Sequence, residues 1–588
     1  MKKIITLIIS IAFFTSALSQ NLPHVLTPAE SQLIPQYNAL RNGYNSINAG
    51  IVTPPTSPVR TIGEWEELQG FTITWTSYTT MLREIVRNAK LETRVYIIVA
   101  STTERNNAIN FLAAGSVDTV NVSFVITPYN SVWSRDYGMW SVYTNDVDSL
   151  LSVDWIYNRP RPKDDTAHYA LANLLGTPLY KTTTWPWDLV NTGGNFMTDG
   201  FGTAFASKLI LDDNLPAAGF NVNHTAAEID TIMFHFMGIN RYIKMEKLPY
   251  DQIHHIDMHI KLLDEQTLLV GQYPAGTADG PQIEANLQYV LNNFSSVYGT
   301  PYKVIRIPMP PDNGAYPPTS GADYYTYTNS SFINKTIIVP TYNIPQDTIA
   351  LNIYRNALPG YKVVGINSTS SIGALGALHC ITKEIGTSDP LLISHQSLED
   401  TYDAVNPYTV NALMKHRSGI ATPMMYYTTD TTQPYIAVAM TASAQPDWFT
   451  AQIPAQPVGT EIFYYVQATA NSGKQQVRPI AAPIGYWHFH VLPPVGINEI
   501  ASTKFEMQPA FPNPSKGITC IPASFSKSTH ITVTLEDVTG KIIDKIFEGQ
   551  SKQGEQKFFI NTDNIAAGIY VIRMHGADAS AVQKLVVR

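Results

Sequence analysis

The sequence predicts an α/β fold followed by two smaller β domains, on three observations. Strand-like and helical patterns alternate from residue 61 to about residue 402. A strand–helix–strand unit found near the start of this region returns near its end, and beyond it the helical patterns stop and short strands take over. A repeated unit of this kind indicates a pseudosymmetric architecture, in which equivalent loops converge on one central face.

The first residues indicate export. Lys2 and Lys3 precede an apolar run from Ile4 to Phe14, and "TSALSQ" then offers small residues at the positions of a cleavage site. This pattern predicts a secretory signal peptide over residues 1–19, the alternative being a buried N-terminal helix. Residues 20–60, which end in the proline-rich "IVTPPTSPVR", are expected to be a leader or propeptide. No later apolar stretch reaches membrane-spanning length, so we expect a soluble chain or one anchored by other means.

Composition excludes several classes of protein. The formal net charge of −8 over 588 residues argues against a nucleic-acid partner. The two cysteines, Cys380 and Cys520, are far apart and fall in different expected domains, which argues against a disulfide framework. Cys520 is most simply interpreted as a buried apolar residue. Cys380 follows the glycine-rich "GALGALH" and is either a small buried hydrophobe, the usual fate of a free cysteine, or a nucleophile.

The elements of the α/β region, expected over residues 61–402, follow in order. Near its start come a strand, "VYIIVA", a helix, "ERNNAINFLAAG", that ends at Gly115, and a second strand, "NVSFVITP". Near its end come "KTIIVPTYN", "DTIALNIYRNALPG" and "YKVVGINSTS", again strand, helix and strand. Between them, "AAEIDTIMFHFMGINRYIKM" and "IEANLQYVLNNFSSVYG" are helical patterns that lead into strands.

The remaining chain divides into two β domains. Over residues 403–495, the short strands "MMYYTTD", "PYIAVAMTA", "TEIFYYVQATA" and "GYWHFHVL" predict an immunoglobulin-like sandwich. "LPPVGIN" is a linker. Residues 496–588 form a second small β domain, with strands in "ITVTLEDVTGKIIDKIF" and in the final "AAGIYVIRMHGADASAVQKLVVR".

Apolar and polar residues alternate in one segment. In "DQIHHIDMHIKLLDEQTLLVG", Ile256 and Met258 alternate with His255, Asp257 and His259. The alternation predicts a strand that presents His255 and Asp257 on one face, and "DEQ" then turns the chain into a second strand. Taken alone, these two residues fit the solvated face of a strand equally well.

Four successive units each place a polar residue after a comparable strand: Asp136, the pair of His255 and Asp257, Asn329, and Cys380. Individually, Asp136 is best explained as a turn or ion-pair residue and Asn329 as a turn residue. Their equivalent placement in one repeat favours a single site instead. A planar guanidinium cation suits two carboxylates, each of which accepts a pair of its N–H donors. The thiolate then attacks the central carbon, and an imidazolium protonates the departing ammonia.

The motifs "VWSRDYGMW", "NTGGNFMTDG", "HHIDMH", "YTNSSFIN" and "GALHCIT" resemble the Porphyromonas-type peptidylarginine deiminases, of the wider family that includes agmatine deiminase. The resemblance covers about residues 61–400 and continues into the immunoglobulin-like part. It implies a pseudo-fivefold α/β propeller of the guanidino-modifying type. It also implies these roles: Cys380 as nucleophile, His255 as general acid and base, Asp136 and Asp257 as guanidinium ligands, Asn329 as a supporting polar residue, and Trp133 as a wall of the substrate channel.

The segment "WIYNRPRPKDD" provides evidence about the substrate class. Arg159 and Arg161, stiffened by the intervening proline, are placed to clamp a carboxylate, which a peptide ending in arginine has and agmatine lacks. The motif is similar in the peptidylarginine enzymes, where it has that role; the alternative is a solvated loop. Asp199 either lines the pocket or serves its own turn. We therefore expect hydrolysis of peptide arginine, preferably at the C-terminus, to citrulline and ammonia.

"PNPSKG", "DVTGKII" and the final "KLVVR" resemble the C-terminal sorting domain of type IX secretion cargo. The resemblance implies passage through the type IX machinery, with secretion or attachment to the outer-membrane surface. The chemistry requires no metal or other cofactor, and no zinc-type His/Cys spacing is present, while the acidic loops leave structural calcium open. Two rival hypotheses remain: an enzyme for agmatine or a free arginine derivative, and a non-catalytic surface binding protein.

Overall fold

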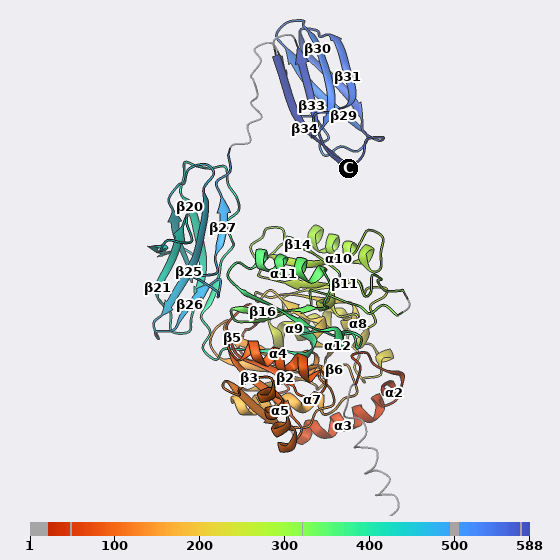
Figure 1. Cartoon of the computed structure of the whole chain (residues 1–588), viewed down its shortest axis with the longest axis vertical. Helices are drawn as coiled ribbons and strands as arrows, with labels where there is room; N and C mark the ends of the chain where they lie inside the picture. Colours follow the sequence, from red (N-terminus) through yellow and green to blue (C-terminus); the bar gives the residue numbers. More distant parts are fainter. Residues whose placement is uncertain (1–21, 48–49, 320, 494–504, 577–578) are drawn as a thin grey trace, which may run out of the picture. The chain divides into compact units, whose positions relative to one another are not determined.

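The computed structural model describes residues 22–47, 50–319, 321–493, 505–576 and 579–588. The predicted signal peptide lies outside them. The chain divides into two compact units, Met1–His490 and Val491–Arg588, which are described separately (Figure 1). Within the described ranges, every helix is too short or too polar to span a bilayer.

Five small mixed sheets form the α/β part of the first unit. In each, one strand pairs antiparallel with a second, and the second pairs parallel with a third across a connecting helix. The repeated unit expected from the sequence is therefore present, and the mixed α/β class is confirmed. In hydrogen-bonded order the sheets are β18-β2-β3-β4, β1-β5-β6-β7 with β8 beside β6, β11-β10-β9, β12-β13-β14 and β15-β16-β17.

The strands of these sheets are β1 (Val59–Thr61), β2 (Leu68–Thr74), β3 (Arg94–Val99), β4 (Val122–Ile126), β5 (Trp140–Thr144), β6 (Leu150–Tyr157), β7 (Leu179–Thr182), β8 (Val190–Asn191), β9 (Met197–Thr198), β10 (Thr203–Ser207), β11 (Arg241–Met245), β12 (Ile260–Leu262), β13 (Thr267–Gln272), β14 (Lys303–Pro308), β15 (Ser331–Ile333), β16 (Thr336–Thr341), β17 (Lys362–Asn367) and β18 (Lys383–Gly386).

The helices are α2 (Pro28–Ser31), α3 (Ile34–Ile47), α4 (Thr79–Ala89), α5 (Thr102–Ala114), α6 (Ser134–Tyr137), α7 (Asp164–Leu175), α8 (Leu209–Asp213), α9 (Ala226–Met237), α10 (Gly280–Asn293), α11 (Gln346–Ala357) and α12 (Thr369–Ile372), with 3-10 turns η1 (Gly193–Asn195), η2 (Pro216–Ala218), η3 (Ile256–Met258) and η4 (His379–Ile381).

Local signals set the helix ends. The hydroxyl of Ser101 accepts from the backbone N–H of Glu104 at the start of α5, and the helix stops at Gly115, as the sequence predicts. Helix α9 begins with a capping box between Thr225 and Glu228. It ends at Gly238, whose left-handed φ of 70° suits glycine.

The last strand of this region returns to the first. Strand β18 pairs antiparallel with β2, with Lys383 opposite Thr72 and Glu384 opposite Phe71. Because β2 also starts the parallel set β2-β3-β4, the end of the α/β part is hydrogen-bonded to its beginning. The repeat therefore closes on itself.

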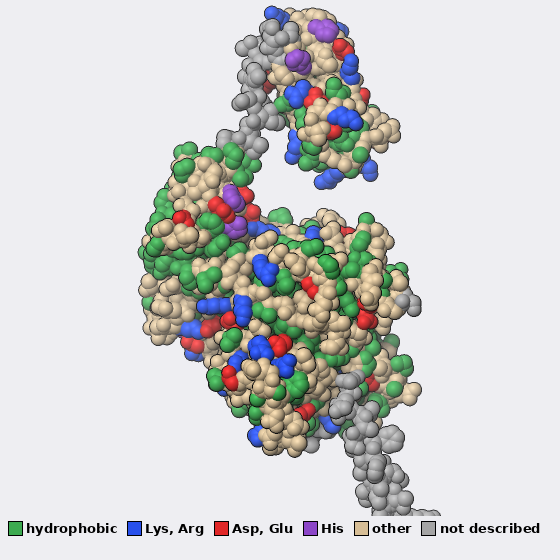
Figure 2. Space-filling view, viewed as in Figure 1, with side chains coloured by type: hydrophobic (Ala, Val, Ile, Leu, Met, Phe, Trp, Pro, Cys, Tyr) green, Lys and Arg blue, Asp and Glu red, His purple; other side chains and the backbone are tan. Residues whose placement is uncertain are grey.

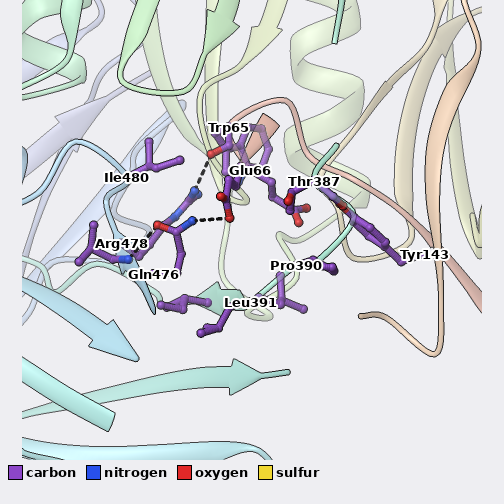
Figure 3. Close-up of a pocket in the computed structure, with 13 residues that line it drawn as sticks. Trp65, Glu66, Tyr143, Thr387, Pro390, Leu391, Gln476, Arg478 and Ile480 are labelled. Carbon is purple, nitrogen blue, oxygen red and sulfur yellow. Dashed lines mark hydrogen bonds between the residues drawn. The ribbon is translucent and has the colours of Figure 1, made fainter. Parts of the chain in front are cut away.

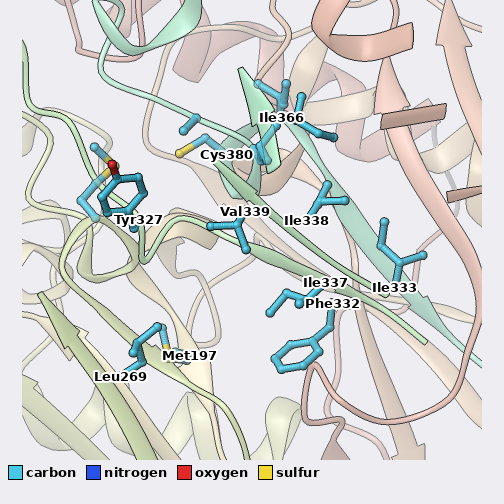
Figure 4. Close-up of a cluster of buried hydrophobic side chains, with 14 of the residues drawn as sticks. Met197, Leu269, Tyr327, Phe332, Ile333, Ile337, Ile338, Val339, Ile366 and Cys380 are labelled. Carbon is cyan, nitrogen blue, oxygen red and sulfur yellow. The ribbon is translucent and has the colours of Figure 1, made fainter. Parts of the chain in front are cut away.

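The main apolar core of the α/β part includes the nucleophile candidate. Strand β16 contributes Ile337, Ile338 and Val339, all fully buried, and Figure 4 shows them in the same cluster as Cys380. Cys380 is itself fully buried within this cluster. The thiol is thus packed like a small hydrophobe, and its polar neighbours decide whether it is also reactive.

One predicted strand is wrong. The alternation at residues 255–261 was expected to form a strand, but Ile256–Met258 is the 3-10 turn η3, and β12 begins only at Ile260. Both sets of side chains in the alternation are buried, so its period does not separate a core face from a solvent face. The turn at Asp264–Gln266 and the antiparallel return strand β13 are present as predicted.

The rest of the first unit is antiparallel. Two sheets, β19-β20-β24-β23 and β22-β21-β25-β26 with β27 beside β25, follow the α/β part. Arg478 joins the two parts: it donates to the carbonyl of Trp65 at 3.0 Å (Figure 3). It also pairs with Glu265 at 3.3 Å. The strands are β19 (Leu392–Ser394), β20 (Tyr408–Lys415), β21 (Ile420–Thr428), β22 (Ile436–Ala439), β23 (Thr441–Ala442), β24 (Trp448–Ile453), β25 (Glu461–Ala470), β26 (Gln475–Arg478) and β27 (Trp487–His490).

The second unit is entirely β within its described residues. Its sheets are β28-β29-β32 and β31-β30-β33-β34, and Cys520 is buried in β29, as expected of an apolar residue. On the face of the chain drawn in Figure 2, acidic and basic side chains are interspersed. The strands are β28 (Phe505–Met507), β29 (Ile518–Phe525), β30 (His530–Asp537), β31 (Ile542–Gln550), β32 (Gly554–Asn561), β33 (Gly568–Gly576) and β34 (Ala579–Val587).

Candidate active site

Five turns occupy equivalent positions in the repeat. In each sheet, the turn directly precedes the first strand of the antiparallel pair described above, or β18 in the sheet that contains β2. They are α6 before β5, η1 before β9, η3 before β12, the loop of residues 326–330 before β15, and η4 before β18. Four of the five contain the predicted residues, in the order Asp136, then His255 and Asp257, then Asn329, then Cys380. Turn η1 contacts α6, η3 and η4, and α6 also contacts η4, so equivalent loops converge as the repeat predicts.

Cys380 has a polar environment. Its Sγ accepts from Nδ2 of Asn329 at 3.2 Å and lies 3.8 Å from Oδ2 of Asp257. Oδ1 of Asn329 accepts in turn from the backbone N–H of His379 at 3.0 Å, which orients the amide toward the sulfur. Burial, followed by the charges of Asp257 and Asp136, raises the pKa of the Cys380 thiol well above its ordinary value. A bound cation beside the two carboxylates would lower this pKa again.

His255 and Asp136 lie across the same site. Nδ1 of His255 is 3.8 Å from Oδ1 of Asp136. Burial lowers the pKa of His255 to about 3, despite the opposing effect of Asp136. Burial raises the pKa of Asp136, but His24 and His255 more than offset this effect, so the carboxylate stays ionised. Among the described residues, neither nitrogen of His255 nor Oδ1 of Asp257 has a hydrogen-bond partner, which leaves these buried groups available to a ligand.

The fifth turn, η1, was missed as part of the site. The backbone N–H of Gly194 donates to Oδ1 of Asp136 at 3.2 Å. A Cβ on Gly194 would lie 3.1 Å from Cγ of His255 and 3.2 Å from Oδ2 of Asp257, with Nδ1 of the imidazole closer still. A Cβ on Gly193 would collide with the backbone carbonyl of Arg135. The sequence signal was the pair of adjacent glycines in "NTGGN", which indicates a close backbone approach.

A buried network of side chains, formed by His379, Glu64 and Lys261, supports Asp257. Sequence reasoning missed this network too. Nδ1 of His379 lies 2.7 Å from Oδ2 of Asp257, and its Nε2 lies 2.9 Å from Oε1 of Glu64. Nζ of Lys261 pairs with the other oxygen of Glu64 at 2.7 Å. Burial opposes ionisation of Glu64, but His379 and Lys261 hold its pKa well below the ordinary value. This network of side chains fixes the Asp257 carboxylate, which faces the Cys380 thiol.

The N-terminal residues enter this site. His24, fully buried, is hydrogen-bonded through Nε2 to Oδ2 of Asp136. Its ring stacks on Trp133 with centroids 4.3 Å apart and meets His255 edge-on at 4.9 Å. Nε of Arg159 donates to the backbone carbonyl of His24 at 3.0 Å. Trp133 and Arg159 thus line the place where the predicted guanidinium ligand Asp136 is found.

Arg161 is also buried against the N-terminal residues. Its Nη2 donates to the carbonyl of Pro23 at 2.6 Å, and its Nε pairs with Glu30 at 2.8 Å. Neither Arg159 nor Arg161 is a solvated loop residue, because both are less than 10% exposed. Asp199, by contrast, serves its own turn: its Oδ1 accepts from the N–H groups of Phe201 and Thr203. Within the described part of the chain, its side chain forms no hydrogen bond with the other predicted residues.

The assembled groups are a thiol, an imidazole, two carboxylates and an amide, all of them buried. This set suits nucleophilic attack on a planar cation. Within the described residues, His24, Asp136 and His255 also bring one ligand atom each close enough to hold a metal ion, as do the more exposed Glu461, His488 and His490.

Comparison with known proteins identifies two regions. The family model described as Porphyromonas-type peptidyl-arginine deiminase matches residues 60–385, and that of a secretion system C-terminal sorting domain matches residues 509–588. The sorting domain indicates export and a secreted or cell-surface location.

Two relatives are similar to this chain in sequence, and one solved structure is similar to it in fold. A Vibrio parahaemolyticus protein provisionally named an agmatine deiminase is 23% identical over 324 residues, covering 50% of this chain and 86% of that protein. A Legionella pneumophila protein named in the same way is 25% identical over 275 residues, covering 45% and 75%. The solved agmatine deiminase of Enterococcus faecalis matches the fold with a TM-score of 0.50 at 18% identity, covering 58% of this chain and 100% of that one.

Proposed function

Because the chain belongs to the Porphyromonas-type peptidyl-arginine deiminase family, we propose that it hydrolyses the guanidinium of peptide arginine to citrulline and ammonia. The observation that carries the proposal is the meeting of Cys380, His255, Asp136 and Asp257 in equivalent turns of one repeat. Under this proposal the five sheets are the blades of a pseudo-fivefold propeller. The antiparallel part that follows is an immunoglobulin-like sandwich.

The residues divide the reaction into two steps. Asp136 and Asp257 accept the N–H groups of the guanidinium, and this added positive charge makes the Cys380 thiol easier to ionise. The thiol proton passes to His255 as the sulfur attacks the guanidinium carbon. The imidazolium then returns a proton to the departing nitrogen, the C–N bond breaks, and ammonia leaves a thiouronium on Cys380.

Water completes the reaction. His255, neutral again, takes a proton from a water molecule that attacks the thiouronium carbon. The C–S bond breaks, the thiolate is restored, and the product carries the ureido group of citrulline. Asn329 stabilises the thiolate through its Nδ2 donor. No step requires a metal ion or another cofactor.

Arg159 favours a peptide over agmatine. It donates to the backbone carbonyl of His24, the residue whose side chain reaches Asp136. A substrate arginine whose side chain reached Asp136 from the same backbone position would place its own carbonyl, or its terminal carboxylate, on Arg159. Agmatine has neither group. A terminal carboxylate would gain a charge-assisted hydrogen bond, hence the preference for C-terminal arginine.

A citrulline assay tests the proposal with three substrates: a peptide ending in arginine, the same peptide with an added C-terminal residue, and agmatine. The assay uses the His24→Ala chain, in which Asp136 is free. We expect the C-terminal peptide to react fastest and Cys380→Ala to be inactive. Arg159→Ala should lower kcat/KM for that peptide by about 10-fold or more, the loss of a charge-assisted hydrogen bond, and leave agmatine unaffected.

Arg94→Ala is the matched control, since Arg94 is exposed and hydrogen-bonded to Ser123 outside the site. Faster turnover of agmatine than of either peptide would overturn the peptide assignment and support the agmatine alternative. Absence of citrulline from all three, with Cys380 unreactive toward a cationic haloacetamidine, would support a non-catalytic binding protein instead.

A further inference from the structure

We propose that residues 22–47 are a built-in inhibitor of this site, in which His24 takes the place of the substrate guanidinium. The inference rests on the proposed function for the identity of the ligand that His24 imitates. The catalytic groups it covers are closed to solvent: Cys380 and His255 are fully buried and Asp136 is 1% exposed. A chain in this state cannot admit a peptide arginine.

The His24 ring imitates a guanidinium in shape and in its hydrogen-bond partners. Its Nδ1 lies 2.8 Å from the carbonyl oxygen of Leu375, which can only accept a hydrogen bond. Its Nε2 is hydrogen-bonded to the carboxylate of Asp136. Both ring nitrogens therefore face oxygen acceptors, as the N–H groups of a guanidinium would, and the flat ring stacks on Trp133.

The backbone of the segment is held like a bound peptide. Three successive carbonyls, those of Leu22, Pro23 and His24, accept from Nε1 of Trp133, Nη2 of Arg161 and Nε of Arg159, at 3.0, 2.6 and 3.0 Å. The N–H of His24 donates to the carbonyl of Ala374 at 3.1 Å. These contacts are made with backbone atoms of the segment and not with its side chains. Trp133, Arg161, Arg159 and Ala374 could therefore bind the backbone of a substrate peptide with any residues around its arginine.

Further contacts anchor the segment beyond His24. Glu30 pairs with Arg161 at 2.8 Å and also completes the capping box that starts α2. Helix α3 then packs Ile34 and Tyr37 against Phe220 in a separate apolar cluster. Nδ2 of Asn38 donates to the carbonyl of Gly219 at 2.8 Å. The segment is thus held at several points along its length, and His24 contacts the catalytic groups.

Attachment makes the inhibition strong, and cleavage would relieve it. While the segment is part of the chain, its effective concentration at the site is high, and cutting the connection turns binding into a bimolecular event. The connection after α3 includes residues 51–58, of which Ile51, Thr53, Thr56 and Pro58 are exposed. We infer that proteolysis in this stretch releases the segment and produces the active enzyme.

The test compares the chain lacking only the predicted signal peptide with its His24→Ala variant. Two readouts are measured: the rate at which a cationic haloacetamidine labels Cys380, followed by mass spectrometry of the intact protein, and citrulline formation from an arginine peptide. We expect His24→Ala to raise both by about 10- to 100-fold, the value of one charge-assisted hydrogen bond. Glu30→Ala should raise both by less, because the His24 contacts remain.

His235→Ala is the matched control, since His235 is exposed on α9 and should change neither readout. In a further arm, a site-specific protease sequence placed at residues 53–56 is cut, and the cut chain should reach at least the His24→Ala rates. Equal labelling of the wild-type, His24→Ala and cut chains would overturn the proposal. A chelator that alone raises labelling of the uncut wild-type chain would also overturn it, because a metal held by His24, Asp136 and His255 would then close the site.

The two readouts separate this proposal from the preceding one. Faster labelling of Cys380 without any citrulline would uphold the inhibitory segment and contradict the deiminase assignment. Citrulline formed at the same rate with and without the segment would do the reverse.

Discussion

Replacing Gly194 by alanine should slow the enzyme strongly without unfolding it. The new Cβ would lie 3.1 Å from Cγ of His255, with Nδ1 closer still, and 3.2 Å from Oδ2 of Asp257. Non-bonded heavy atoms prefer separations of about 3.5 to 4 Å, so the imidazole must retreat by roughly 1 Å. The neighbouring carboxylate blocks the simplest alternative, a shift of the turn itself.

The size of the effect follows from that displacement. A misplacement of about 1 Å at a reacting group costs on the order of 100-fold in rate, which is the expected fall in kcat/KM. Overpacking a buried position costs the fold about 1–3 kcal/mol, less than the 5–15 kcal/mol that holds a typical domain together. The protein should therefore fold and bind, but react slowly.

Citrulline release from an arginine peptide, measured in the His24→Ala chain, gives the rate, and a thermal melt followed by circular dichroism checks the fold. Gly568→Ala is the matched control, because its Cβ would meet Tyr570 at an ordinary 3.5 Å. If Gly194→Ala keeps its activity to within about twofold while folded, then His255 is not confined by this turn and the site geometry argued above is wrong.

Three further predictions concern the same site. Asn329→Ala removes the donor to Cys380 and should lower kcat by about 10-fold or more with little change in melting temperature, measured by the same assay; an unchanged kcat would contradict its role. Glu64→Gln removes the carboxylate at Nε2 of His379 and at Lys261, and it should lower the unfolding free energy at pH 7 by about 3 kcal/mol in urea titrations. Because the folded-state pKa of Glu64 is depressed, its contribution is present above the unfolded pKa of about 4.5, and the gap between the two proteins should narrow as pH falls below that value; a constant gap would refute this linkage. Because the pKa of Cys380 is raised, alkylation of the His24→Ala chain by neutral iodoacetamide should still be accelerating above about pH 10, and Asp257→Asn should move the profile to lower pH; a plateau near about pH 10 would show an ordinary thiol.

The repeat was predictable because each helix and each buried strand carries its own local signal. Gly115 marks the end of α5, and the apolar runs mark β3 and β16. Equivalent positions in a repeat lie at equivalent places in space, so the proximity of Cys380 and Asp257 could be expected from order alone. The same reasoning failed at residues 255–261, where a buried 3-10 turn imitates the alternation of a strand.

Other parts of the site had no local signal. Glu64 lies near the start of the α/β part and His379 near its end, and only the pairing of β18 with β2 explains how they can meet. His24 lies in a segment that reads as an ordinary leader, and nothing in its sequence shows that the ring reaches Asp136. Such long-range contacts are set by topology, which periodicity does not encode.

The pairing of β18 with β2 also determines how much of the chain must be present before the active site can form. Residue 383 must be available before residue 72 gains its antiparallel partner, and Cys380 lies only three positions earlier. Contacts so distant in sequence form slowly, because the intervening chain must be ordered first. Placement of the nucleophile therefore depends on the last strand of the α/β part, and we expect an N-terminal fragment that stops short of β18 to lack a competent centre.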